Sequence, residues 1–176
     1  MTWMLTRSGR RFDPIDPQPE MIDLLDIAHG LSNECRYSGQ CRQFYSVAQH
    51  SVLVSEIVPH EIALEALLHD ATEAYIKDIP RPIKALLPDY RRLEARVDAA
   101  IRLRFGLPAQ TSPDIKHADL VLLATERRDL MPATGGQWES IHGIKPLEQT
   151  IRAAHTSRAK LLFLERALEI LQGDMA

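Results

Sequence analysis

Two adjacent residues, His69 and Asp70, interrupt an apolar stretch of the sequence that runs from Ile62 to Ala74. Burying an imidazole and a carboxylate among leucines is costly unless something binds them, and a divalent cation is the usual partner. A second histidine, His50, precedes this stretch, and Asp119 follows it on a later segment. The four residues form a mixed nitrogen and oxygen ligand set that suits a cation used in hydrolysis.

Helix geometry sets how these four side chains could meet. Neighbours on a helix diverge by about 100°, so His69 and Asp70 would approach one ion from different sides, at a seam between helices. His50 and Asp119 would complete the set from two other helices. Four protein ligands leave two positions of an octahedral cation for water and a substrate phosphate. Donors of this type accept Mn, Co, Fe, Ni, Mg or Zn, so the identity of the metal stays open.

Two further acids lie close to this pair in the sequence. Glu73 follows His69 by one helical turn and so projects towards the same site. Asp78 comes just after the apolar stretch, beside Pro80 and Pro82. Such a density of ionisable groups in an apolar segment indicates a site, so Glu73 and Asp78 are the candidate acid–base residues.

The combined pattern resembles a known family. His50, His69-Asp70 and Asp119 are similar to the H…HD…D motif of the HD-domain metal-dependent phosphohydrolases, and the string from His69 to Lys84 resembles the nucleotidase branch. The resemblance covers roughly residues 26–129. It implies an HD-domain helical bundle that hydrolyses deoxynucleotides with a divalent cation. It also implies that Glu73 and Asp78 both take part, and we assign Asp78 to orienting the attacking water and Glu73 to supporting it.

A phosphate needs cations, and Arg36 and Lys84 are the candidates. The resemblance places Arg36-Tyr37 where the deoxynucleotidase branch keeps an arginine followed by an aromatic residue. It implies that Tyr37 stacks on the base, with Ile79 and Pro82 as the opposite wall. The alternative is that Arg36 and Tyr37 only fix their loop. The remaining charged and aromatic residues of interest are expected to be solvated charges or, for the tryptophan, a packing residue: Arg42, Lys77, Arg81, Arg127, Arg128 and Trp138.

Three functions remain open at this point. The first is a 5′-deoxynucleotidase, which releases phosphate from a deoxynucleoside monophosphate. The second is a triphosphohydrolase, which releases tripolyphosphate from a deoxynucleoside triphosphate of the dATP type. The third is an HD module that binds a nucleotide without cleaving it, although all four ligands and both acids are present. The balanced charge makes a nucleic-acid phosphodiesterase a weaker possibility.

Size and composition limit the other classes of protein. At 176 residues, of which 45% are apolar, the chain fits one domain spanning residues 1–176. Its formal charge of −3 is spread over interspersed acids and bases, so we expect no nucleic-acid and no membrane partner. The two cysteines, Cys35 and Cys41, predict no disulfide framework, and no apolar segment suggests a signal peptide or membrane span. We expect a cytoplasmic protein, and the resemblance implies a homo-oligomer.

The expected fold is an all-α bundle of about six helices with a small β-hairpin in residues 1–20, followed by a helical core over residues 21–172. A capping box at Ser46 and Gln49 predicts one helix start, and Ser112-Pro113 predicts another. Gly106 predicts a helix end. The pattern indicates helices over residues 21–33, 46–58, 61–76, 89–105, from 113 onwards and 147–171, with a rigid loop or short turn over residues 77–84.

Overall fold

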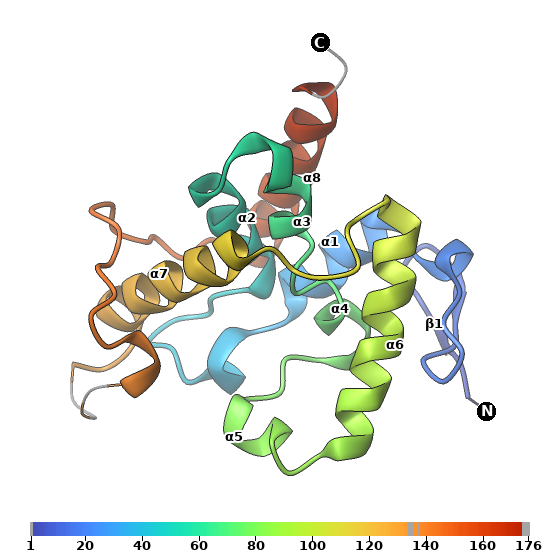
Figure 1. Cartoon of the computed structure of the whole chain (residues 1–176), viewed down its shortest axis with the longest axis horizontal. Helices are drawn as coiled ribbons and strands as arrows, with labels where there is room; N and C mark the ends of the chain where they lie inside the picture. Colours follow the sequence, from blue (N-terminus) through green and yellow to red (C-terminus); the bar gives the residue numbers. More distant parts are fainter. Residues whose placement is uncertain (1, 134–135, 137, 174–176) are drawn as a thin grey trace.

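A computed structural model describes residues 2–133, 136 and 138–173. Within them the chain is mostly helical, with a small two-stranded antiparallel sheet (Figure 1). The expectation of a helical protein with a short N-terminal hairpin is therefore confirmed. The helices are α1 (Leu24–Asn33), α2 (Val47–Ile57), α3 (Ala63–Leu67), α4 (Glu73–Ile76), α5 (Arg81–Lys84), α6 (Pro88–Phe105), α7 (Pro113–Leu130) and α8 (Thr156–Gly173).

The hairpin pairs β1 (Met4–Leu5) with β2 (Arg11–Phe12). Its turn contains Gly9 at a φ of +81°, in the left-handed region that glycine adopts without a steric penalty. Phe12 is fully buried and stacks on Tyr75 of α4, with the ring centroids 4.2 Å apart. The hairpin is thus attached to the helical core through an aromatic pair.

Two helix boundaries, the start of α2 and the end of α6, follow the local sequence signals. The Ser46 hydroxyl accepts a hydrogen bond from the Gln49 backbone N–H and caps α2. The Gln49 side chain does not reach back as a capping box requires. It donates to the carbonyl of Arg152 and accepts from the N–H of Ala154, and so fixes the segment before α8. Gly106, at a φ of +65°, ends α6 as predicted.

The expected helix over residues 61–76 is wrong, because the structure breaks it between Leu67 and Glu73. In a continuous helix the carbonyl of Ala66 would accept a hydrogen bond from the N–H of Asp70. Here the Nδ1 of His69 lies 2.7 Å from that carbonyl and takes its place. The break puts His69 and Asp70 in a turn between α3 and α4, where both side chains can face the same point.

The expected start of the last helix at residue 147 is also wrong, because α8 begins at Thr156. Residues 147–151 instead run beside α7 in an irregular conformation (Figure 1). The Thr125 hydroxyl accepts from the N–H of Leu147, and the Asp129 carboxylate accepts from the N–H of Ile151. Side chains of α7 therefore satisfy backbone N–H groups of this irregular segment.

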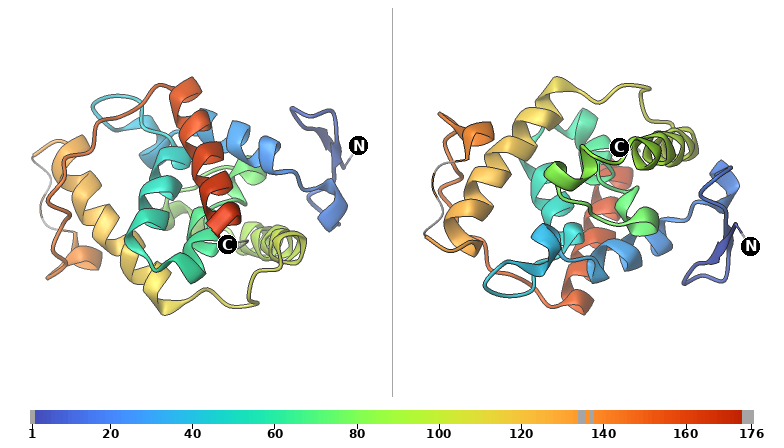
Figure 2. Two further views of the ribbon diagram at one scale, coloured as in Figure 1. Left: turned by 90° about the horizontal axis from the view of Figure 1, so that it is seen from above. Right: turned by 90° about the horizontal axis from the view of Figure 1, so that it is seen from below.

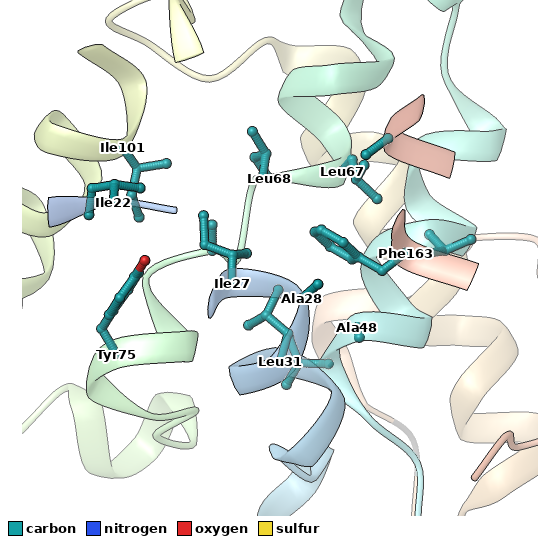
Figure 3. Packing of buried hydrophobic residues seen from close by; sticks show 14 of the residues in the cluster. Ile22, Ile27, Ala28, Leu31, Ala48, Leu67, Leu68, Tyr75, Ile101 and Phe163 are labelled. Carbon is teal, nitrogen blue, oxygen red and sulfur yellow. The ribbon is translucent and has the colours of Figure 1, made fainter. Parts of the chain in front are cut away.

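The core lies where α8 packs on α1, α2 and α3 (Figure 2). Ile27, Leu31 and Leu67 are fully buried there around Phe163 of α8 (Figure 3). Beside this core α1 approaches α4 closely, since a Cβ at Gly30 would lie 2.7 Å from the Ala74 carbonyl oxygen. A glycine is required at this contact, which holds α4 in place.

No helix in the described part of the chain is both long enough and apolar enough to cross a membrane. Cys35 and Cys41 are free thiols.

Candidate metal centre

The centre is built from three separate parts of the helical core. His50 lies in the first turn of α2 and is fully buried, His69 and Asp70 come from the turn after α3, and Asp119 comes from α7. Because α2 packs against both α3 and α7, these side chains can converge. The structure thus brings together the four residues that the sequence pattern selects.

The donor atoms of these residues lie close to one another. The Nε2 atom of His50 is 3.3 Å from the Nε2 atom of His69 and 3.3 Å from an Asp119 carboxylate oxygen. Ligand atoms of these three residues all fall within 4.8 Å of one another. The Oδ2 atom of Asp70 is 3.2 Å from the Nε2 of His69 and 3.5 Å from that of His50. Atoms that share one cation at about 2.0–2.2 Å lie roughly 3 Å apart, so this donor set fits a small divalent cation.

Both imidazole rings are oriented for this role. The Nδ1 atom of His50 lies 2.7 Å from a carboxylate oxygen of Glu126, and the Nδ1 atom of His69 lies 2.7 Å from the carbonyl of Ala66. If each Nδ1 donates its proton to that acceptor, each Nε2 offers its lone pair to the space shared with Asp70 and Asp119. Ligating histidines are held in this way in metal sites generally.

The electrostatics of the centre also suit a cation. Burial and Arg36 lower the pKa of His50, but Glu126 and Asp119 raise it more, to about 9. His50 therefore carries a proton at neutral pH that a bound cation would replace. Burial raises the pKa of Asp119, yet the hydrogen bond from His50 brings it below its ordinary value. The pKa of Asp70 is likewise lowered against burial, chiefly by His69, so both carboxylates are ionised.

Glu126 is the functional residue that the sequence reasoning missed. It is fully buried, and besides His50 it binds the guanidinium of Arg36 at 3.2 Å and the hydroxyl of Tyr37. Burial raises its pKa, but Arg36 and His50 lower it to about 2. A signal was available, because Glu126 follows Asp119 by two helical turns and so shares its face of α7.

Arg36 is mostly buried beside the centre. One end of its guanidinium binds Glu126, and the other lies 3.4 Å from a carboxylate oxygen of Asp70. Tyr37 follows at a φ of +55°, so the backbone does not continue there as a regular right-handed helix. Arg36 and Tyr37 do fix their loop, as the alternative interpretation holds, and they also line the cavity next to the centre.

A cavity of about 510 Å³ opens beside the four ligands, a volume within the usual range for small-molecule sites. Asp70 and Asp119 contribute to its wall. Every residue that the sequence selected for catalysis or substrate binding also lines it: Arg36, Tyr37, Glu73, Asp78, Ile79, Pro82 and Lys84.

Searches with models of known families give no match to this chain. The uncharacterized protein YfdR of Escherichia coli is 48% identical over 169 residues, which are 94% of each chain. The chain belongs to the same family as YfdR. An uncharacterized protein of Rhodobacter capsulatus is 44% identical over 126 residues, covering 66% of this chain and 64% of that one. Neither name states an activity.

The two acids of the cavity differ from ordinary surface carboxylates. Glu73 is buried, and its Oε2 atom has no hydrogen-bond partner among the described residues. Burial, Asp70 and Asp78 together raise the pKa of Glu73 well above its usual value. Burial also raises the pKa of Asp78, whose backbone N–H donates to Glu34. The cavity thus holds two carboxyl groups whose affinity for protons is enhanced.

The positively charged side chains around the cavity differ in the ion pairs that they already form. Lys84, expected to bind phosphate, forms an ion pair of 2.6 Å with Glu94. Arg81, expected to be a solvated charge, also lines the cavity, and its guanidinium lies 3.5 Å from the second oxygen of Asp119. The expectation for Trp138 was incomplete, because it lines the cavity as well.

Arg127 and Arg128 are not simply solvated, contrary to expectation. The Arg127 guanidinium donates to the carbonyls of Pro132 and Gly136, and Arg128 donates to those of Leu147 and Gln149. Both arginines hold the segment after α7 against that helix.

Proposed function

We propose that the chain is an HD-domain metal-dependent phosphohydrolase that acts on deoxynucleotides, as a 5′-deoxynucleotidase. The observation that carries this proposal is the convergence of two imidazole Nε2 atoms and two carboxylates beside a cavity that also contains acids and arginines. A purely structural cluster has no need of the acids Glu73 and Asp78, one of which leaves an oxygen unpaired.

The residues divide the work as follows. His50, His69, Asp70 and Asp119 would hold the cation, which when bound supplies Lewis-acid polarisation of a phosphoryl oxygen and lowers the pKa of water. Asp78 orients the attacking water and accepts its proton. Glu73, whose pKa is raised well above its usual value by burial, Asp70 and Asp78, supports the departure of the nucleoside oxygen by donating a proton to it.

The overall reaction consumes one water and breaks one phosphorus–oxygen bond. A monophosphate yields the deoxynucleoside and orthophosphate. A triphosphate cleaved at the same bond would yield the deoxynucleoside and tripolyphosphate. The presence of Arg81 at the same cavity supports the triphosphate as the second candidate, since additional phosphates need additional cations.

Phosphorus NMR of the products tests the proposal. The purified chain is incubated with each deoxynucleoside mono- and triphosphate in the presence of Mn, Co, Fe, Ni, Mg or Zn. Orthophosphate from a monophosphate supports the nucleotidase, and tripolyphosphate supports the alternative. His69→Ala should reduce turnover at least about 100-fold, whereas the exposed His117→Ala on α7 should not.

Two outcomes contradict the proposal. Hydrolysis that persists in His69→Ala without bound metal overturns the metal-dependent mechanism. Tight, metal-dependent nucleotide binding without any turnover favours a non-catalytic nucleotide-binding module instead.

A further inference from the structure

We propose that Trp138 is a specificity-determining residue, forming the wall on which the nucleobase of the substrate stacks. This inference rests on the proposed function and adds to it the part of the substrate that lies away from the phosphate. Trp138 belongs to the segment between α7 and α8, far in sequence from the four ligands, yet it lines the same cavity.

Trp138 and Gly136 both contact Arg127 of α7. The Arg127 guanidinium donates to the carbonyl of Gly136, and its central carbon lies 5.1 Å from the centre of the Trp138 ring. Residues 139–141 form the short helix η4 (Glu139–Ile141) directly after it, and Ser140 of this helix lines the cavity. The short helix lies below α7 in Figure 1. The tryptophan is therefore held by its own contact with α7, as a binding surface requires.

The wall of the cavity provides a place for a flat apolar group. Trp138, Leu123, Ile79 and Pro82 supply apolar surface, while the carboxylates lie in the same cavity. A nucleoside phosphate likewise has a planar base at one end and an ionic phosphate at the other. Nucleobases stack on aromatic side chains with a substantial gain in affinity.

Tyr37 cannot hold the base between itself and Trp138. The two ring centroids are 5.9 Å apart and the rings are tilted by 45°, whereas a base inserted between two rings needs about 7 Å. The hydroxyl of Tyr37 is bound to Glu126, so the ring is not free to move aside. The base must therefore stack on one of these two rings alone, and Trp138 offers the larger ring.

Steady-state kinetics with a base-free substrate test the inference. Trp138→Ala should raise KM at least about 5-fold for deoxynucleoside monophosphates with little change in kcat. It should leave KM for 2-deoxyribose 5-phosphate unchanged, and Trp138→Phe should retain most of the native affinity. Trp3→Phe, on the N-terminal hairpin, is the matched control and should behave like the native chain. An equal effect of Trp138→Ala on both substrates, or on neither, overturns the inference.

Fluorescence separates this inference from the proposed function. The sequence contains two tryptophans, so Trp3→Phe leaves Trp138 as the single reporter. In the presence of Mg²⁺, deoxynucleotides should quench its emission and 2-deoxyribose 5-phosphate should not. Quenching without any phosphate release would support the base wall and contradict the hydrolase, whereas hydrolysis without quenching would contradict the base wall alone.

Discussion

The Nδ1 atom of His50 lies 2.7 Å from the Oε1 atom of Glu126, and both side chains are fully buried. The other oxygen of the same carboxylate accepts from Arg36 and from the hydroxyl of Tyr37. One carboxylate therefore orients a candidate metal ligand and two residues of the substrate cavity. A substitution of Glu126 should therefore affect both metal binding and substrate binding.

Glu126→Gln should weaken metal binding about 10–100-fold. The amide has one oxygen in place of two, so it cannot accept from His50 and Arg36 at the same time. Competition with a chelating dye measures the affinity. Glu65→Gln is the matched control, because Glu65 is a buried carboxylate that pairs with Arg102 away from the centre. Unchanged affinity in Glu126→Gln, or an equal loss in both variants, would contradict the orienting role.

The same carboxylate should make stability depend on acid pH when a chelator is present. The pKa of Glu126 is about 2 in the folded chain, below its ordinary value of 4.5. A lowered pKa contributes stability above about pH 4.5, and this contribution is lost as the pH falls towards 2. We expect the native chain to exceed Glu126→Gln by about 3 kcal/mol in the free energy of unfolding at neutral pH. Urea unfolding should show that difference shrinking below pH 4.5, and a difference constant with pH would refute it.

Much of this arrangement is encoded locally and was predictable. Ser46 and Ser112 cap their helices and Gly106 ends one, because capping depends on a few neighbouring residues. The break after Leu67 was not predictable, since the apolar pattern continues through it. It depends on the contact of the His69 ring with a backbone carbonyl, which only the assembled site favours.

Contacts between distant segments explain the other differences. Residues 147–151 have a sequence compatible with a helix, but they pair with side chains of α7 that no local pattern reveals. Ion pairs between neighbouring helices also depend on such contacts. Lys84, predicted to bind phosphate, forms an ion pair with Glu94 on the next helix, a partner that its local sequence does not reveal. The ligand set was recognisable because its residue types are costly to bury, whichever segments they come from.

Lys77, the residue before Asp78, should be a point of backbone strain. Its φ is +80° and its ψ is 150°, a conformation that favours glycine. Its exposed ammonium also pairs with Glu34. Lys77→Gly and Lys77→Ala both lose that ion pair, but only glycine relieves the strain. We expect Lys77→Gly to be more stable than Lys77→Ala by about 1 kcal/mol in urea unfolding. Equal stability of the two variants would show that the backbone there is relaxed.

Arg81 should contribute to binding the substrate phosphate. Its guanidinium is largely exposed and lies 3.5 Å from Asp119, so a cation that neutralises Asp119 would leave Arg81 facing the phosphate. Arg81→Ala should raise KM about 10-fold with little change in kcat. Arg158→Ala on α8 removes the same charge away from the cavity and should leave KM unchanged. Because Arg81 is exposed, salt should weaken its contribution to substrate binding. The ratio of the KM of Arg81→Ala to the KM of the native chain should therefore approach one near 0.5 M salt. A salt-independent ratio would mean that Arg81 acts through the structure of α5 and not through its charge.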